Sequence, residues 1–225
     1  MTEILSPEEL EVLRQYDTPT ISNAIEVFDV RPRSEGFCSP RIRCMFPDLG
    51  VMVGYAVTAT VRAERPASPG APSRPQWWEM VQKAQGPKIA VLQDMDDPPM
   101  GSFWGEVQSN IHSALGCIGT VTHGGVRDLD AMRGVGFFTF ATEILVSHAY
   151  IHMVELGVPV KIGGLWVHPG DLLHGDQHGV CVIPHEIARR IPEAVQKVEQ
   201  KERRIIQTCQ SPDFSIEKLR EATGL

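Results

Sequence analysis

The sequence lacks the features that would place the protein in a membrane or in an oxidising compartment. No run of apolar residues approaches the roughly 20 that a membrane-spanning helix needs. The beginning, MTEILSPEELEVL, is acidic and has neither the basic start nor the apolar stretch of a secretory signal. The five cysteines are scattered without a C-x-x-C pair, which excludes a disulfide framework and a zinc ribbon. We therefore expect a cytoplasmic protein without a membrane partner.

Basic residues are also few, which narrows the partners and the chemistry. The 21 basic residues against 28 acidic ones give a net charge of −7, which argues against a nucleic-acid partner. Six of the basic residues are lysines, and none lies between Lys88 and Lys161, so this region offers no Schiff-base nucleophile. No P-loop, G-x-G-x-x-G or G-x-S-x-G motif follows a predicted strand. A nucleotide-binding methyltransferase and a serine hydrolase are therefore disfavoured.

The remaining composition is that of an ordinary globular protein. Hydrophobic residues make up 42% of the 225 residues and charged residues 22%, close to average usage. A chain of this length hides roughly 70–75% of its unfolded surface on folding, which is enough for a hydrophobic core that needs no disulfide bonds or bound metals. The stretch RPASPGAPSRP at residues 65–75 holds four prolines and is typical of a surface loop rather than a domain linker. We expect one domain over residues 1–225.

Helices are predicted at both ends of the chain. The stretch SPEE at residues 6–9 combines a capping hydroxyl, an early proline and a glutamate three residues after the cap, so a helix begins there and continues to about residue 16. A second helix is expected after residue 20, which places the N-terminal helices within about residues 6–28. A long helix over 184–208 and a short one over 215–221 are expected to form a C-terminal helical tail at 184–225.

The middle of the chain alternates between predicted strands and helices. Strands are expected at 53–61, 88–93, 117–122 and 137–141, and helices at 77–85, 104–115 and 128–133. Such β–α units bind ligands beyond the carboxyl ends of their strands. Further strands at 150–156, 158–162 and 180–183, separated by glycine-rich turns, indicate an antiparallel or mixed part. The predicted fold class is therefore α/β with mixed sheets.

One pair of charged residues stands where a ligand is expected. Arg127 and Asp128 directly follow a predicted strand and two glycines, which let the backbone turn tightly and a ligand come close. The pair can be read as an ordinary surface ion pair. Its place at a strand end favours a functional reading, in which the guanidinium binds a carboxylate and the aspartate binds a hard divalent cation.

A helix start upstream can reach the same place. The stretch GSFWGE at residues 101–106 runs into a predicted helix, whose first free backbone N–H groups can bind an anion. Alone, it is also explained as a plain helix entry with a glutamate that favours the dipole. However, 20 residues separate Glu106 from Arg127, and a helix plus a strand brings both to one edge of the sheet.

The histidines invite a metal interpretation that we consider the weaker one. His148 and His152 would lie roughly 13 Å apart along a strand, too far to chelate one ion, so we predict two half-buried strand histidines. The histidines and aspartates within residues 168–178 fall among Pro-Gly-Asp and Asp-x-x-Gly sequences, which are common turn chemistry. We expect them to serve structural turns.

These motifs together resemble the RraA-like superfamily, which includes 4-hydroxy-4-methyl-2-oxoglutarate aldolases and ribonuclease-regulating relatives. The D/E-x20-R-D pattern of that family corresponds here to Glu106, twenty residues, Arg127 and Asp128. The segment YDTPTISNAIE resembles the N-terminal helix of the family, and the glycine-rich stretch from Val158 to Val180 resembles its C-terminal strands. The likeness covers roughly residues 10–205.

The resemblance implies a three-layer β/β/α, swivelling-domain-like fold, assembled as a homotrimer or homohexamer with active sites between subunits. It implies that Asp128 binds Mg²⁺ or Mn²⁺, that Glu106 holds water on the metal, and that Arg127 contacts the substrate. Backbone groups at Gly105, Val107 and Gln108 would bind a substrate carboxylate. Sparse protein ligation suits magnesium, which keeps several waters.

The function implied is a metal-dependent class II aldolase that cleaves a 4-hydroxy-2-oxo acid to release pyruvate. Oxaloacetate decarboxylation is expected at the same site because it forms the same enolate. A glutamate from the C-terminal helix of a neighbouring subunit, Glu202 or Glu199, is implied to complete the site. The competing class is a non-catalytic, protein-binding regulator of the ribonuclease-inhibitor type. The proline-rich loop at 65–75 and His178, where many relatives have an acidic residue, depart from the family pattern.

Overall fold

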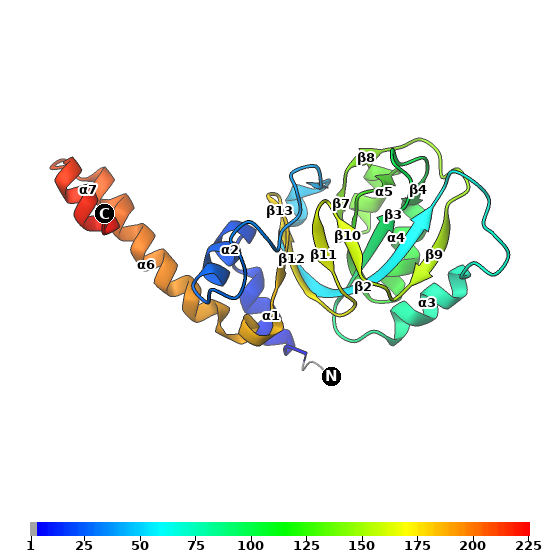
Figure 1. Ribbon diagram of the computed structural model, residues 1–225, viewed down its shortest axis with the longest axis horizontal. Coiled ribbons are helices and arrows are strands. Elements are labelled where there is room, and N and C mark those ends of the chain that lie inside the picture. The colour runs from blue at the N-terminus through cyan, green and yellow to red at the C-terminus, as the bar shows by residue number, and fades with distance from the viewer. Residues whose placement is uncertain (1–3) are drawn as a thin grey trace.

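The computed structural model describes residues 4–225 and is built around one mixed sheet of eight strands (Figure 1). Its strands are β1 (Arg43–Cys44), β2 (Met52–Arg62), β3 (Lys88–Asp94), β5 (Cys117–Thr122), β7 (Phe138–Ala141), β9 (His152–Leu156), β12 (Leu172–Asp176) and β13 (Gly179–Ile183). The order is β1-β7-β5-β3-β2-β12-β13, and β9 pairs with the far end of the long strand β2. The central strands β2, β3, β5 and β7 are parallel, and the outer pairings are antiparallel. The predicted mixed sheet is confirmed.

Two smaller sheets and the helices complete the structure. β10 (Val160–Ile162) and β11 (Leu165–Val167) form a hairpin, and β4 (Ser102–Trp104), β6 (Gly125–Val126) and β8 (Glu143–Ile144) form a short parallel sheet. The helices are α1 (Pro7–Arg14), α2 (Thr18–Glu26), α3 (Arg74–Lys83), α4 (Glu106–Ala114), α5 (Leu129–Gly134), α6 (Ile191–Gln210) and α7 (Ile216–Thr223). Two short 3-10 helices span Pro47–Leu49 and His185–Arg190. None of the described helices is long and apolar enough to span a membrane.

The main sheet is covered by helices on one face and by the β10–β11 hairpin on the other. Residues of β3 show this alternation: Ala90 and Leu92 pack with Trp77 of the helical side, whereas Ile89 and Val91 pack with the hairpin. Successive residues of a strand point to opposite faces, so a strand buried on both faces reads as a continuous apolar run. The expected three-layer β/β/α arrangement is confirmed.

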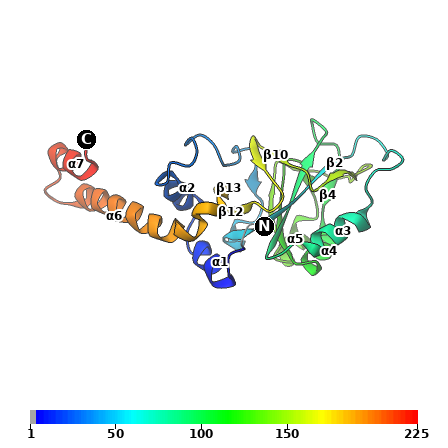
Figure 2. The same ribbon diagram turned by 60° about the horizontal axis from the view of Figure 1, so that its bottom comes forward.

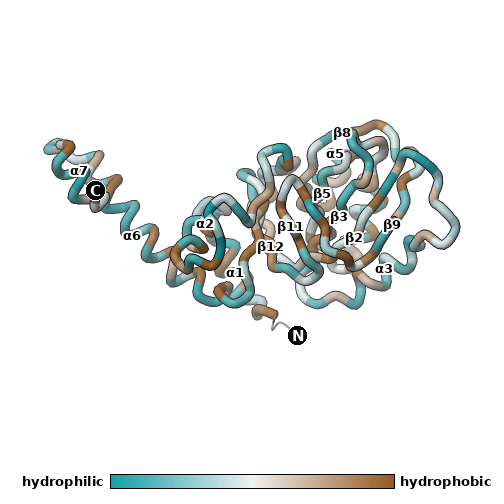
Figure 3. The backbone as a smooth tube through the Cα atoms, in the orientation of Figure 1, coloured by the Kyte–Doolittle hydropathy of each residue, from teal (hydrophilic) through white to brown (hydrophobic). Residues whose placement is uncertain are grey.

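The N-terminal and C-terminal helices form a separate layer against one end of the sheet. α1 and α2 pack with α6 around a core that includes Leu13, Ile21 and Ile191. Beyond this contact α6 runs on, away from the sheets, and carries α7 at its outer end in both views (Figures 1 and 2). Hydrophobic residues follow the strands in Figure 3, whereas the outer part of α6 is mostly hydrophilic.

Several predicted boundaries need correction. α2 begins at Thr18 rather than after Thr20, because Asp17 caps it by accepting the N–H of Thr20. α3 begins at Arg74 rather than at residue 77, because Ser73 and Gln76 form a capping box at the end of the proline-rich loop. The expected start of the long C-terminal helix at residue 184 is a 3-10 turn, and the α-helix begins at Ile191.

Six strands were not predicted: β1, β4, β6, β8, β11 and β12. The sequence predicts a loop and a helix start at β4 and turn-rich connections at β11 and β12. β12 lies inside the sheet, between β2 and β13, and is wholly buried, although it contains His174 and Asp176. His174 bonds Thr18 and the carbonyl of Leu13, and Asp176 accepts the N–H of Thr18. The N-terminal helices thus satisfy the polar groups of a buried strand.

A buried histidine joins α4 to α3. Trp77 Nε1 donates to His112 Nε2 at 2.7 Å, so His112 Nδ1 carries the proton and donates to the carbonyl of Gln108 at 2.7 Å. Burial lowers the pKa of His112 to about 4. The helix that begins at the candidate active site is therefore fixed to the core by a neutral histidine.

This histidine should make the folded state sensitive to acid. Above the ordinary histidine pKa of 6.5 it is neutral in both states. As pH falls from 6.5 towards 4, His112 binds a proton in the unfolded chain but not in the folded chain, so the free energy of unfolding decreases. Urea unfolding should show a loss of about 2 kcal/mol between pH 7.5 and pH 4.5 that a His112→Gln variant lacks. Parallel stability curves for the two proteins would contradict this assignment.

Candidate active site

Arg127 and Asp128 line a cavity of about 330 Å³ at the start of α4. The cavity lies where β4 and β6 of the short sheet lead into the helices α4 and α5. Its lining residues are Arg74, Ser102, Phe103, Gly105, Val107, Gln108, Arg127, Asp128, His148 and Ile151. The cavity contains two guanidinium groups, a carboxylate and the first turn of a helix, which suits a small anionic ligand.

Asp128 has an unusual backbone conformation that follows from its place in the chain. It stands between β6 and α5 with φ 54° and ψ 42°, in the left-handed region that few residues other than glycine, asparagine and aspartate adopt. Its Oδ2 accepts the backbone N–H of Glu106 at 3.2 Å and lies 3.7 Å from Nε of Arg127. Strained backbone of this kind is often found at functional sites.

Gly105 permits this arrangement because it leaves room for both charged side chains. A Cβ atom at Gly105 would lie 2.6 Å from Oδ2 of Asp128 and 3.2 Å from Cγ of Arg127. Since the backbone at Gly105 is extended (φ −176°), space and not backbone strain requires glycine here. Asp128 also replaces the missing side-chain cap of α4, because its carboxylate holds the first helical N–H.

Most of the predicted site residues come together. Gly105, Val107, Gln108, Arg127 and Asp128 line the same cavity. The contact between Asp128 and the N–H of Glu106 confirms that the 20-residue spacing returns the chain to one edge of the sheet. The side chain of Glu106 is exposed beside the cavity and is not part of its lining.

Gln108 brings an unpaired polar group to the cavity. Gln108 is 8% exposed, and its side-chain Oε1 is buried without a hydrogen-bond partner among the described residues. A buried acceptor without a donor costs about 1–3 kcal/mol, which a ligand donor would recover. The sequence indicated only the backbone at this position, and the buried side chain is a structural finding.

Five further residues of the cavity were not predicted as site residues: the apolar Phe103 and Ile151 and the polar Arg74, Ser102 and His148. The prediction that His148 is a half-buried strand histidine is wrong, because β9 begins only at His152 and His148 is exposed in the preceding loop. Only the helix-start motif pointed to Ser102. Nothing near Arg74 or His148 in the sequence marks them, because loop packing brings them to the site.

The two C-terminal glutamates do not reach this cavity within one chain. Glu199 and Glu202 are exposed on α6, on the opposite side of the molecule from α4 and α5 (Figure 1). Glu202 accepts a hydrogen bond of 3.3 Å from Asn23 of α2. Their part in the site therefore stays a prediction that requires a second subunit.

The residues between 168 and 178 make turn contacts. The N–H of His168 donates to Asp171 at 2.7 Å, and His178 donates its N–H to Asp176 at 2.8 Å. His178, the departure from the family pattern, thus helps to hold the carboxylate that anchors Thr18.

The buried thiols of Cys38, Cys117 and Cys181 have pKa values raised to about 12 by burial, so they are poor nucleophiles.

Exposed apolar side chains surround the cavity. Val146 is 95% exposed, Val107 66% and Ile144 64%. The carbonyl of Val146 accepts a bond of 3.5 Å from Arg127, and Ile144 pairs with Val126 next to the site. Apolar groups gathered around a polar cavity are typical of an interaction surface.

The donor set decides which kind of metal fits. Among residues 4–225, no three histidine, cysteine, aspartate or glutamate side chains converge as a closed metal site would require. Asp128 offers one exposed carboxylate, with Glu106 beside it. So sparse an oxygen set suits Mg²⁺ or Mn²⁺, which retain water and take substrate oxygens, and does not suit a structural zinc ion.

Comparison with known proteins agrees with this fold. The model of the RraA-like family, described as Aldolase/RraA, matches residues 18–182. The chain therefore belongs to the RraA-like family.

Individual relatives are distant. A protein of Halalkalibacterium halodurans named "Putative 4-hydroxy-4-methyl-2-oxoglutarate aldolase" is 32% identical over 119 residues, 46% of this chain and 56% of that protein. Protein DlpA of Legionella pneumophila is 28% identical over 122 residues, 53% of this chain and 20% of that protein. The chain thus spans from a fifth to just over half of the length of these curated relatives.

Solved structures share the fold over nearly the whole chain. An uncharacterized protein from Pseudomonas syringae pv. tomato matches with a TM-score of 0.76 and 23% identity, over 98% of this chain and 96% of that chain. RraAS2 of Streptomyces coelicolor, described as an unusual member of the RNase ES inhibitor RraA protein family, matches with a TM-score of 0.70 and 22% identity, over 89% and 97%. At these identities the likeness concerns the fold alone.

Proposed function

We propose that this protein is a divalent-metal-dependent class II aldolase that cleaves a 4-hydroxy-2-oxo acid and releases pyruvate. The observation that carries the proposal is the joint placement of Arg127, Asp128 and the first turn of α4 around one small cavity. Two relatives named as 4-hydroxy-4-methyl-2-oxoglutarate aldolases, at 32% and 38% identity over parts of the chain, support the choice of substrate class.

Asp128 would hold the metal, with Glu106 close enough to orient water beside it. The bound ion would supply a Lewis acid for the keto oxygen of the substrate. The free N–H groups of Val107 and Gln108, which the first turn of a helix leaves without partners, would bind the substrate carboxylate. The buried Oε1 of Gln108 would accept a hydrogen bond from a hydroxyl group of the same substrate.

The reaction then follows from where charge develops. A water oriented by Glu106 removes the proton of the C4 hydroxyl, the C3–C4 bond breaks, and its electron pair moves onto the keto oxygen as an enolate. Arg127 would stabilise that negative charge with its planar guanidinium. Protonation at C3 gives pyruvate, and C4 leaves as a carbonyl. Loss of carbon dioxide from oxaloacetate produces the same enolate, so this activity is proposed as a side reaction.

The exposed apolar residues around the cavity support a site closed by a second subunit. Val107, Ile144 and Val146 would be covered in a homotrimer or homohexamer. α6, which extends beyond the body of its own chain, would then bring Glu202 or Glu199 to the site of its neighbour (Figure 2).

A pyruvate-release assay tests the proposed function. The purified protein should release pyruvate from 4-hydroxy-2-oxo acids and from oxaloacetate when Mg²⁺ or Mn²⁺ is present, and EDTA should abolish the release. A metal-independent rate would contradict the proposed chemistry. The absence of pyruvate from the whole panel would favour the protein-binding regulator instead.

Arg127→Lys should be a damaging change although it keeps the charge. Lysine loses the planar pair of donors that a carboxylate or enolate oxygen can accept. We expect kcat/KM to fall by a factor that corresponds to about 2–4 kcal/mol of transition-state stabilisation. Arg133→Lys, in an exposed ion pair with Asp48, is a matched control that should keep normal kinetics. A normal kcat/KM for Arg127→Lys would show that Arg127 has a structural and not a catalytic role.

A further inference from the structure

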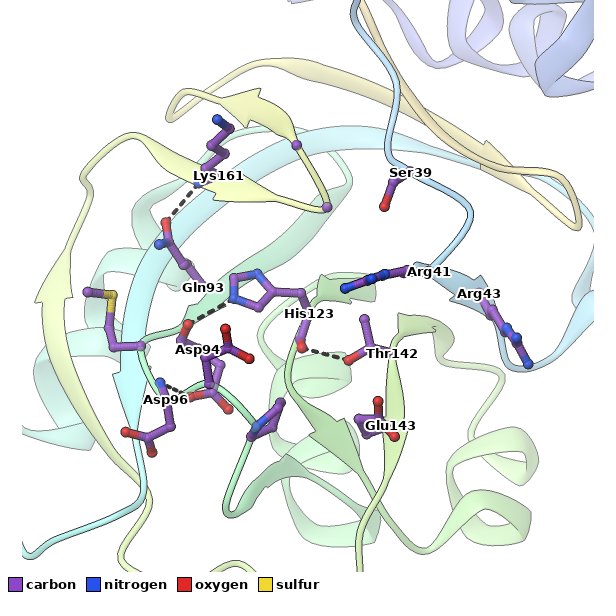
Figure 4. Close-up of a pocket in the computed structure, with 15 residues that line it drawn as sticks. Ser39, Arg41, Arg43, Gln93, Asp94, Asp96, His123, Thr142, Glu143 and Lys161 are labelled. Atoms are coloured by element: carbon purple, nitrogen blue, oxygen red, sulfur yellow. Dashed lines mark hydrogen bonds between the residues drawn. The ribbon is translucent and has the colours of Figure 1, made fainter.

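A second cavity, of about 740 Å³, lies at the carboxyl ends of the parallel strands β3, β5 and β7 (Figure 4). It shares no lining residue with the candidate active site. The carboxyl edge of parallel strands is where α/β folds most often bind ligands. A cavity of this size holds a molecule of sugar dimensions. The proposed aldolase chemistry makes no use of it.

Asp94, at the end of β3, presents a buried carboxylate to this cavity. The residue is 3% exposed, and its Oδ1 accepts the N–H of Asp96 at 3.0 Å. Its Oδ2 has no hydrogen-bond partner among the described residues, and Figure 4 shows the carboxylate directed into the cavity. Gly124 allows this packing, since a Cβ there would lie 2.8 Å from Oδ2. Oδ2 is therefore an acceptor that is open to the cavity and has no donor among the described residues.

His123, at the end of β5, adds a second acceptor to the same wall. Its Nε2 lies 2.9 Å from the carbonyl of Asp94, so Nε2 donates its proton there. Burial lowers the pKa of His123, which keeps the ring neutral and leaves Nδ1 as an acceptor. Nδ1 is buried and has no partner among residues 4–225. Neighbouring strands thus end in two unpaired acceptors, which hydroxyl groups would satisfy.

Three basic side chains, Arg41, Arg43 and Lys161, line the rest of the cavity together with the acidic residues Asp96, Asp97 and Glu143. Arg41 reaches towards His123 across the cavity in Figure 4, while Arg43 and Lys161 stand at its edge and point away. Neither Arg41 nor Arg43 forms an ion pair with another described residue. A guanidinium that faces a cavity without a carboxylate partner is typical of a carboxylate or phosphate site.

We propose that this cavity is a binding site for a small hydroxylated anion, a sugar acid or a sugar phosphate. Arg41 binds the acidic group, and the hydroxyl groups donate to Asp94 and to the wall formed by His123. Burial raises the pKa of Asp94 to about 6, so the carboxyl remains mostly ionised at neutral pH and accepts these hydroxyls. No three metal-ligating side chains converge among residues 4–225, so the cavity contains no preformed metal centre.

Titration calorimetry at pH 7.5 with defined probes tests this proposal. Ribose 5-phosphate and gluconate provide the two anion types, whereas ribose and inorganic phosphate each lack one half of the required chemistry. We expect at least one hydroxylated anion to bind, and to bind about tenfold or more tightly than ribose or phosphate. The anion that binds more tightly shows whether the site recognises a phosphate or a carboxylate group. Failure of both to bind at about 10 mM would overturn the proposal.

Two variants assign the binding to this cavity. Arg41→Ala changes an exposed residue, and Asp94→Asn keeps an acceptor for the N–H of Asp96. Each should weaken binding by about tenfold or more, the scale of one charge-assisted hydrogen bond. The exposed residues Arg65 and Asp213 lie outside the cavity, and Arg65→Ala and Asp213→Asn should bind normally.

A third variant separates this site from the candidate active site. Asp128→Asn should bind the anion as the unchanged protein does, because the two cavities have no residue in common. Binding that disappears in Asp128→Asn and persists in Arg41→Ala would place the ligand in the other cavity and overturn the proposal. Since binding is measured without turnover, this result is independent of whether the protein proves to be an aldolase.

Discussion

The variant Asp128→Asn should lose metal-dependent pyruvate release by more than about 100-fold, beyond the usual effect of altering an outer-shell group. The reason is the sparse donor set, because few described oxygen ligands other than Asp128 stand at this cavity. Removing its charge weakens the attraction for a hard divalent cation, while water and substrate alone cannot fix the ion. The loss should be largest at limiting Mg²⁺ and smaller when the metal is in excess.

The fold should survive this change. Asparagine retains an oxygen that accepts the N–H of Glu106, and it tolerates the left-handed backbone that Asp128 adopts. An unchanged melting temperature and oligomeric state would confirm this. Asp130→Asn removes the same charge two residues later on the exposed side of α5 and serves as the matched control. Wild-type activity of Asp128→Asn at limiting Mg²⁺ would show that the metal assignment is wrong.

The parts of this structure that could be predicted are those fixed by residues close in sequence. The capping box of Ser6 and Glu9 starts α1 where it was expected, since both partners lie within four positions. The return of Arg127 to Glu106 was also predictable, because a helix followed by a strand has a fixed length. These local and topological rules were enough to locate the cavity.

Contacts between distant segments could not be predicted in this way. His174 and Asp176 of β12 look like turn residues in the sequence. Their partner Thr18 lies 156 and 158 residues earlier, so no local pattern marks them as parts of a buried strand. The placement of His148 beside Arg127 depends on the path of the loop between β8 and β9. A single sequence does not encode such a path as a recognisable pattern.

The same limit applies to groups that a second subunit would supply. Within one chain Glu202 accepts a hydrogen bond from Asn23, and α6 extends away from α4 and α5, so no pattern in the monomer links Glu202 to Arg127. Exposed apolar residues at the cavity and a helix that leaves the body of its own chain are the structural signs of a shared site. A test of sharing must therefore use more than one kind of subunit.

Mixing two inactive variants should restore activity if the site is shared. Asp128→Asn lacks the metal ligand and Glu202→Ala lacks the proposed group from the neighbour, so each homo-oligomer should be nearly inactive. After random exchange of equal amounts, about a quarter of the interfaces combine an intact Asp128 with an intact Glu202, and activity should recover to that level. Pyruvate release before and after verified exchange measures this recovery.

Two controls make the outcome specific to Glu202. Asn23→Ala removes the hydrogen bond that Glu202 makes within its own chain, and it should leave turnover normal if the glutamate acts on a neighbour. Glu199→Ala, one turn earlier on α6, tests the other glutamate in the same assay. Full activity of Glu202→Ala alone would remove this residue from the site and leave Glu199 to be judged. If neither glutamate variant loses activity, or if exchanged mixtures stay inactive, the site is not completed by α6, because only a neighbour's carboxylate predicts both the loss and its recovery.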